Sequence, residues 1–202
     1  MDMRKTGTLP MAILAGLCLA AASGCAGKTH YNVPSVLSFQ PTQGPAGTSV
    51  TITGADFTGI DWVDFGDGPS VLYQVNSGSQ ITATVPENAT SGPIVVENQA
   101  GIGTSVDNIT TPQFQTFLVT PVVTGIAPTS AQVGDSVTIT GSGFFGTTGV
   151  SIGSDVTGST TFTYNDQNQL TVKVGANAVT GPVVVTASGV ASAPGPVCTV
   201  TP

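Results

Sequence analysis

The sequence predicts an all-β protein that contains the same sandwich module twice. Residues 47–54 read GTSVTITG and residues 134–141 read GDSVTITG, while SGPIVV at residues 91–96 is matched by TGPVVV at residues 180–185. Short alternating apolar runs lie between these phrases and are separated by Gly, Pro, Asn and Asp, which is typical of strands and turns. No stretch has a convincing helical period. The chain is therefore expected to hold two tandem copies of one β-module.

Each copy is expected to contain about seven short strands, which is typical of an immunoglobulin-like sandwich. In the first copy the alternating runs cover residues 50–52, 62–65, 71–75, 81–85, 94–96 and 114–119. In the second they cover residues 122–126, 137–139, 150–152, 160–164, 170–174, 183–186 and 197–200. We assign the two sandwiches to residues 33–120 and 121–202. No Gly- or Ser-rich spacer separates them, so a stiff connection is expected.

The N-terminus resembles the signal of a bacterial lipoprotein. Arg4 and Lys5 precede an apolar run at residues 9–22, which is too short to span a membrane as a helix. The run leads into Ala-Ser-Gly-Cys at residues 22–25, which is similar to a lipobox, although Ala stands where Leu is usual. An ordinary signal peptide with an incidental cysteine is the alternative.

The lipobox resemblance implies that residues 1–24 are removed as a signal peptide and that Cys25 carries lipid. Residues 25–32 would then form a short polar tether that keeps the first sandwich close to a membrane. The expected location is the bacterial cell envelope, with the exported protein lipid-anchored at the outer membrane or cell surface.

The charge of the chain argues against a nucleic acid partner. The formal net charge is −7, and Lys28 and Lys173 are the only Lys or Arg residues after the expected signal. Binding to a phosphate backbone needs clustered Lys and Arg, which this chain does not have.

Cysteine usage indicates no disulfide framework. With Cys25 lipidated, Cys198 has no partner, and alignment of the closing strands places it where the first copy has Phe117. We therefore expect Cys198 to be a buried, small apolar side chain and not a reactive thiol.

Four phrases that recur in both copies resemble the IPT/TIG domain, an immunoglobulin-like module of plexins, some transcription factors and bacterial surface proteins. The first two are a Pro- and Gly-containing opening, at residues 41–47 and 128–134, and a Val-Thr-Ile-Thr-Gly strand, at residues 50–54 and 137–141. The other two are a small-x-Phe element, at residues 55–57 and 142–144, and a Val-x-Phe-Gly-like strand, at residues 63–66 and 150–153. Ala55 and Val174-Gly175 depart from the family pattern. Members bind DNA, proteins or carbohydrate, or act as spacers, so the resemblance leaves the function open.

Glycine and phenylalanine positions in the repeated phrases have a physical interpretation of their own. Gly47 and Gly54 bracket a strand, where we expect them to supply the positive φ that tight turns need. Phe57 and Phe144 are expected to fill the interior of each sandwich.

The most suggestive local cluster is acidic and surrounds the single tryptophan. Asp61, Asp64 and Asp67 flank Trp62, and these four residues form the candidate binding face. Calcium is one candidate ligand, because hard cations take oxygen ligands, but the spacing is not that of a helix-loop-helix calcium loop. Asp61 and Asp64 are also expected on opposite faces of a strand. Solvated carboxylates are the simpler interpretation, so no cofactor is expected.

No catalytic set can be assembled from the sequence. The one histidine, His30, lies in the tether, which leaves no base for a nucleophile. Glu87 and Glu97 could nominally form a carboxylate pair for glycoside hydrolysis, but no spacing favours it. We expect no enzyme activity.

Two functional classes remain. The sequence favours a non-catalytic structural or protein-interaction module of the envelope, acting in adhesion or as a spacer. The alternative is a carbohydrate-binding module in which Trp62 and Tyr73 form a stacking platform. A lone Trp in a sandwich strand more often belongs to the core, so the alternative ranks second.

Overall fold

The computed structural model describes residues 30–70, 72–106, 115–155 and 160–202, which form strands and loops. The expected signal peptide, Cys25 and most of the tether lie outside these residues. Within the described ranges, no helix is long and apolar enough to cross a membrane.

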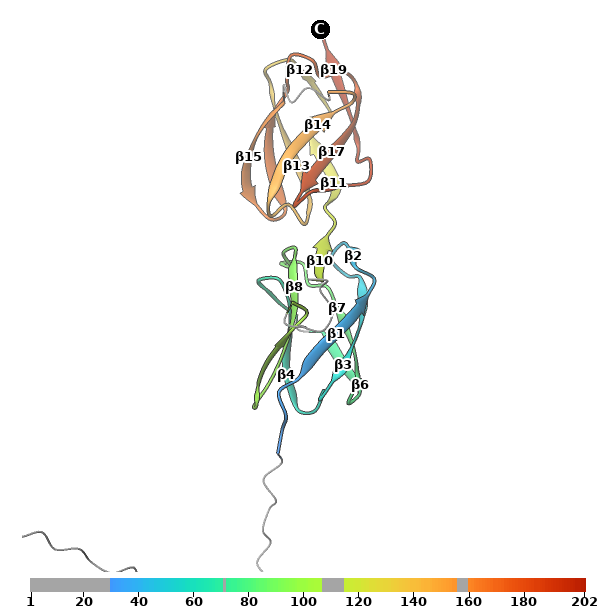
Figure 1. Ribbon diagram of the computed structural model, residues 1–202. Helices are drawn as coiled ribbons and strands as arrows, with labels where there is room; N and C mark the ends of the chain where they lie inside the picture. Colours follow the sequence, from blue (N-terminus) through green and yellow to red (C-terminus); the bar gives the residue numbers. More distant parts are fainter. Residues whose placement is uncertain (1–29, 71, 107–114, 156–159) are drawn as a thin grey trace, which may run out of the picture. The chain divides into compact units, whose positions relative to one another are not determined.

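The first copy folds into two β-sheets (Figure 1). One sheet has the strand order β1-β3-β7-β6, and the other has the order β2-β10-β8-β4-β5 with β9 also paired to β8. The strands are β1 Ser35–Gln40, β2 Gln43–Gly44, β3 Ser49–Ala55, β4 Ile60–Phe65, β5 Gly68–Ser70, β6 Tyr73–Ser77, β7 Gln80–Thr84, β8 Gly92–Asn98, β9 Gly101–Thr104 and β10 Thr116–Val119.

The second copy repeats this arrangement, except that its described residues contain no counterpart of β5. Its sheets have the orders β11-β13-β16-β15 and β12-β19-β17-β14, with β18 paired to β17. The strands are β11 Val122–Ala127, β12 Ser130–Gln132, β13 Ser136–Ser142, β14 Thr147–Ile152, β15 Thr161–Asp166, β16 Gln169–Lys173, β17 Gly181–Ala187, β18 Val190–Ala191 and β19 Val197–Thr201. The predicted all-β class with two tandem immunoglobulin-like sandwiches is therefore confirmed.

The sequence pattern did not predict two short edge strands, β9 and β18. β9 contains two glycines and β18 has two residues, so neither has the apolar alternation that signals a strand. Both become strands because their backbones pair with those of β8 and β17.

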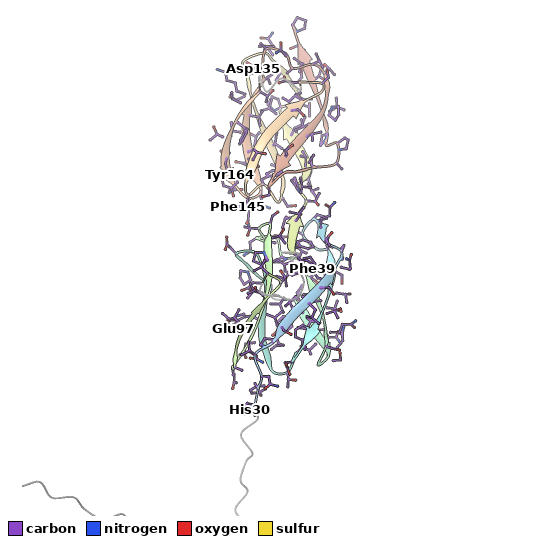
Figure 2. All side chains as sticks on the ribbon, in the orientation of Figure 1. His30, Phe39, Glu97, Asp135, Phe145 and Tyr164 are labelled. Atoms are coloured by element: carbon purple, nitrogen blue, oxygen red, sulfur yellow. The ribbon has the colours of Figure 1, made fainter. Side chains whose placement is uncertain are left out.

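The two cores differ in what fills them. In the first sandwich the ring of Phe117 lies 6.3 Å from that of Phe39 and 5.2 Å from that of Phe65, the latter in an edge-to-face arrangement (Phe39 is labelled in Figure 2). The second sandwich has smaller side chains at the three equivalent positions, Ile126, Ile152 and Cys198. Cys198 is fully buried in this core, which confirms the expectation from the sequence.

Gly54 lies within β3 and does not close it, and it is a glycine for a different reason from the one expected. Gly47 does have a positive φ of 85°, but Gly54 does not. A Cβ at Gly54 would collide with the carbonyl oxygen of Ser35 and the ring of Phe57, so the residue is small because β1 and a core ring approach it closely. Phe57 and its equivalent Phe144 are buried, as expected.

Asn32, expected in the tether, is bonded to the first sandwich. The side-chain amide of Asn98 donates to its carbonyl oxygen at 2.8 Å, and its own side chain donates to Asp56 Oδ1 at 3.0 Å. The described chain begins two residues earlier at His30, which is exposed (Figure 2).

Candidate functional site

The outward face of the sheet around β8 carries Trp62 in a row of three side chains. Trp62 on β4 is directly opposite Glu97 on β8, and Glu97 is directly opposite Ile102 on β9. Directly opposed residues point to the same face of a sheet. The next row, Val63, Val96 and Gly103, is buried, so the row of Trp62 faces away from the core.

Trp62 is an exposed side chain with a fixed position. Its relative exposure is 49%, and its indole Nε1 donates a hydrogen bond to Glu97 Oε2 at 2.7 Å. Glu97 is labelled on the outer side of the first sandwich in Figure 2. The expectation that the lone Trp belongs to the core is therefore wrong. A carboxylate holds the edge of the ring while much of the ring remains open to a ligand.

The three aspartates of the candidate binding face do not converge. Asp64 lies two residues from Trp62 on β4 and shares its outward face. Asp67 is exposed in the β4–β5 turn, where its backbone N–H donates to Thr90 Oγ1 at 2.8 Å. Asp61 sits at a bulge in β4. Within the described ranges, no three His, Cys, Asp or Glu side chains cluster so that they could hold a metal ion.

Tyr73 is partly buried against the core of the first sandwich and does not form a platform with Trp62. Its hydroxyl donates to the carbonyl oxygens of Ile60 and Asp61, each at 2.9 Å, and its ring packs against the core of the first sandwich. Partial burial, and then the nearby Asp61 carboxylate, raise the pKa of Tyr73 above its ordinary value. The backbone carbonyl of Asp61 is thus bonded to Tyr73 of β6. The expected pairing of Tyr73 with Trp62 has no support.

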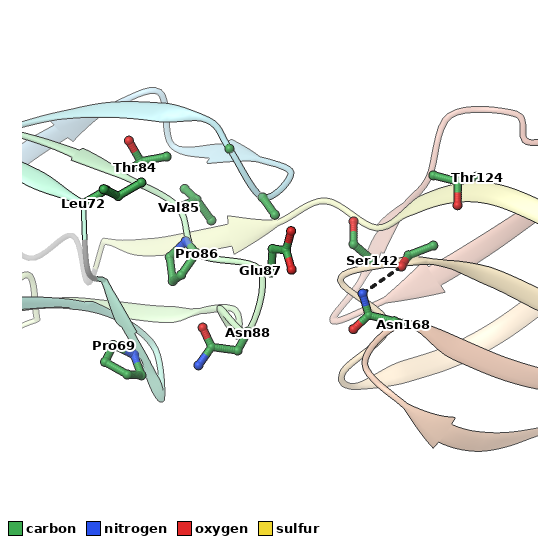
Figure 3. Close-up of a pocket in the computed structure, with 13 residues that line it drawn as sticks. Pro69, Leu72, Thr84, Val85, Pro86, Glu87, Asn88, Thr124, Ser142 and Asn168 are labelled. Atoms are coloured by element: carbon green, nitrogen blue, oxygen red, sulfur yellow. Dashed lines mark hydrogen bonds between the residues drawn. The ribbon is translucent and has the colours of Figure 1, made fainter.

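The two glutamates considered as a catalytic pair lie at different ends of β8. Glu87 is exposed in the loop before this strand, next to Pro86 and Asn88 (Figure 3). Glu97 is the sixth of its seven residues, roughly 16 Å along the strand from Gly92. Glycoside hydrolysis uses carboxyl groups about 5 to 9.5 Å apart, so this arrangement does not provide that pair.

The second sandwich shows that the fold does not need the row of Trp62. The equivalent positions on β14, β17 and β18 are Gly149, Thr186 and Ala191, and they pair across the strands in the same way. The second copy thus has smaller, uncharged residues at all three positions and keeps the strand pairing. The scaffold does not require Trp62, Glu97 and Ile102, and sequence alone did not connect them because they lie on three different strands.

The chain thus consists of two non-identical immunoglobulin-like sandwiches, of which the first presents a fixed aromatic ring. The family model described as "IPT/TIG domain" matches residues 34–113 and again residues 121–199. The protein belongs to the IPT/TIG family, as the repeated phrases indicated. No curated protein matches the sequence.

Several solved structures resemble the chain. A crystal structure with xylogluco-oligosaccharide shares 25% identity over 80% of this chain and 39% of its own, with a TM-score of 0.35. A surface glycan-binding protein from Prevotella bryantii shares 18% identity over 80% of this chain and 41% of its own, with a TM-score of 0.46. The extracellular region of plexin A4 shares 17% identity over 88% of this chain and 19% of its own, with a TM-score of 0.36. The chain spans less than half the length of each.

Proposed function

We propose that this protein is a non-catalytic carbohydrate-binding module that uses the outward face of the first sandwich. The observation that carries the proposal is the half-exposed ring of Trp62, held in place by Glu97. A large flat ring that is fixed before binding loses little conformational freedom when a ligand stacks on it. The function that the sequence ranked second is therefore the one we prefer.

The chemistry of this face suits a sugar ring. The apolar C–H face of a pyranose packs on an aromatic ring, and its hydroxyl groups donate to carboxylate oxygens. Glu97 places a carboxylate beside the ring, and Trp62 bonds only one of its two oxygens. Covering the exposed half of a Trp removes about 100 Å² from water, which is worth about 2 kcal/mol.

The structural or protein-interaction function remains the second candidate. It needs only the loops and strand edges of the two sandwiches. It gives no reason, however, for the first copy to carry Trp, Glu and Ile where the second carries Gly, Thr and Ala. This difference is the specific support for ligand binding at the first copy.

The test is retention of the full chain in gels that contain soluble neutral polysaccharides. Xyloglucan is a first probe, because a xylogluco-oligosaccharide is named for one of the similar structures. Trp62→Gly, which installs the residue found at the equivalent position of the second copy, should weaken binding at least about tenfold. Val133→Thr removes an equally exposed apolar side chain from the second sandwich and should change nothing.

Two results would contradict this function. Retention that is unchanged in Trp62→Gly, with circular dichroism showing an intact fold, would exclude this face as the binding site. Failure of the unmodified chain to bind any neutral polysaccharide in the panel would return preference to the interaction or spacer function.

We also propose that the protein is exported and anchored through lipid on Cys25. The support is the charged, apolar and lipobox-like order of residues 1–25. A carbohydrate-binding module held at the envelope by a lipid would meet polysaccharides outside the cell. Counting thiols in protein purified from membranes tests the anchor.

A further inference from the structure

A second exposed aromatic group lies on the second sandwich. Phe145 and Tyr164 have relative exposures of 52% and 42%, and their ring centroids lie 6.5 Å apart with the planes at 85°. Both are labelled on the same side of this sandwich in Figure 2. The sequence did not single out either residue, because Phe145 follows the strand motif and Tyr164 lies in an ordinary alternating run.

The loop that carries Phe145 turns one phenylalanine inward and the next outward. Phe144 is fully buried, whereas the adjacent Phe145 is exposed. Gly143 and Gly146 flank the pair with φ values of 71° and 72°, a region that favours glycine. The backbone of this loop therefore sets the direction of the Phe145 ring.

Hydrogen bonds tie this loop to the turn that follows Tyr164. The N–H of Phe144 donates to the carbonyl of Gln167 at 3.1 Å. The N–H of Gly141 donates to the carbonyl of Asn168 at 2.9 Å, and the side-chain amide of Asn168 donates back to the carbonyl of Gly141 at 3.1 Å (dashed in Figure 3). The loop that carries Phe145 is thus bonded to the turn that follows the strand of Tyr164, which holds the two rings near each other.

The first sandwich has the same frame without the rings. There the N–H of Phe57 donates to Gly78 and the N–H of Gly54 donates to Ser79, each at 3.0 Å. The positions equivalent to Phe145 and Tyr164 are Thr58 and Val75, the latter opposite Ile81 just as Tyr164 is opposite Leu170. The first copy forms the same frame with Thr58 and Val75 at these positions, so the fold of the frame does not require the two exposed rings.

We propose that Phe145 and Tyr164 form a second binding site, for a pyranose ring of a neutral saccharide. The ligand class rests on the proposed function of the first sandwich. The site itself rests on the independent geometry of the second. Each copy would then carry one aromatic site at a different place on the shared scaffold.

The size of the exposed surface favours a sugar over a protein. Two half-exposed rings offer roughly 200 Å² of aromatic surface, whereas a stable protein interface buries about 800 Å² on each partner. The other exposed apolar residues described in this sandwich, Val133, Val179 and Val197, lie in other loops or strands. Phe162, two residues before Tyr164 on β15, is partly buried against the core. The patch matches one or two sugar rings.

The polar surroundings favour a neutral ligand. Lys173 is the only basic residue of the second copy, and Asp166 lies close enough to Tyr164 to help raise the pKa of its hydroxyl, after the larger effect of partial burial. The phenol therefore stays protonated at neutral pH and can donate to a sugar oxygen. An anionic saccharide would meet the Asp166 carboxylate without a compensating cation.

The experiment compares variants of the full chain in gels containing xyloglucan or mixed-linkage glucan. The double variant Phe145→Thr with Tyr164→Val installs the residues of the first copy, so its fold should be retained. We expect its affinity for the polysaccharide, measured from its retention in the gel, to fall about tenfold relative to the unmodified chain. Thr163→Val, an exposed change on the opposite face of β15, is the matched control and should bind normally.

The fluorescence of Trp62, the only Trp in the chain, separates the two sites. In the double variant, a short oligosaccharide should still change this fluorescence as in the unmodified chain. In Trp62→Gly, retention should be reduced but not lost, and adding the double substitution should abolish it.

The outcomes distinguish the two proposals. If Trp62→Gly alone abolishes all retention, or if the folded double variant binds like the unmodified chain, the second site is rejected and the first stands. If Trp62→Gly has no effect while the double variant loses binding, the second site stands and the first is rejected. If no neutral polysaccharide retards the unmodified chain, both are rejected.

Discussion

Gly54 and Gly141 are the same residue in both copies because the space around them admits no side chain. A Cβ at either position would collide with the carbonyl oxygen of the first strand of that sandwich, Ser35 or Val122, and with a buried ring, Phe57 or Phe144. These atoms belong to backbone and to a packed core, so they have little room to move. Single positions of this kind explain why the repeated phrase is preserved.

Gly54→Ala should therefore destabilise the first sandwich, by about 1 to 3 kcal/mol, the range for an added group in a packed core. Gly78→Ala is the matched control, because a Cβ there meets nothing within 4 Å. Urea unfolding followed by circular dichroism measures both. Equal midpoints for the two variants would show that β1 can move away from Gly54 at no cost.

At the scale of the element, β8 organises the first sandwich. It pairs with β4, β9 and β10, and it ends at the buried Asn98. The side-chain amide of Asn98 donates to the carbonyls of Asn32 and Thr58 at 2.8 and 3.2 Å. Its oxygen accepts from the N–H groups of Ala100 in the β8–β9 turn and of Gly101 at the start of β9, at 2.8 and 3.3 Å. One side chain thus joins the turn, a neighbouring loop and the chain entering the domain.

Asn98→Ala should cost about 1 to 3 kcal/mol of stability, because it leaves buried backbone groups without partners. The neighbouring Gln99 is exposed, and Gln99→Ala should stay within about 0.5 kcal/mol of the unmodified protein. The second copy has Ala187 at the position of Asn98, so this network is confined to the first copy. Thermal unfolding of both variants provides the measurement. A loss of stability no larger than that of Gln99→Ala would mean that the turn does not depend on this network.

At the scale of the whole molecule, the two copies share one plan but differ in core, in charge and in exposed aromatic residues. The aromatic core of the first copy is replaced in the second by two isoleucines and Cys198. Burial raises the pKa of the Cys198 thiol. The neutral thiol therefore contributes stability that is complete below the unfolded-state pKa of about 8.5 and is lost as the pH rises through the folded pKa.

Protein purified from membranes should accordingly show no reactive thiol when folded and one after unfolding. Cys198 is protected by burial, and the thiol of Cys25 is blocked if it carries lipid. Titration with a thiol reagent at pH 8, with and without denaturant, gives the count. Two thiols after unfolding would contradict lipidation of Cys25, and a fast-reacting thiol in the folded protein would contradict the protection of Cys198.

Much of the fold follows from the sequence because its signals are local or repeated. The alternation of Val, Ile and Thr indicated strands, and the repeated phrases indicated two equivalent modules. The alignment of the copies also located the buried Cys198, since its partner position was Phe117. The edge strands β9 and β18 were beyond this reasoning, because their pairing comes from a neighbour and not from their own residues.

The candidate site was only partly accessible from sequence. Asp61, Trp62, Asp64 and Asp67 were grouped because they are adjacent in the chain, and the fold leaves only Asp64 on the outward face of β4 with Trp62. A bulge in β4 between Ile60 and Trp62 shifts the alternation there, so the direction of Trp62 could not be read from its spacing. Glu97, which fixes the ring, is 35 residues away and is brought opposite by strand register.

The sequence by itself determined the all-β class, the duplication and the family, because these depend on periodicity and on phrases that can be compared along the chain. Only the tertiary structure decided which side chains meet on a surface. Trp62 with Glu97 and Phe145 with Tyr164 each join separate segments of the chain, and both contacts depend on strand register and turn geometry. A ligand contacts these surfaces, and they cannot be derived from the order of residues along the chain because they join segments that are distant in it.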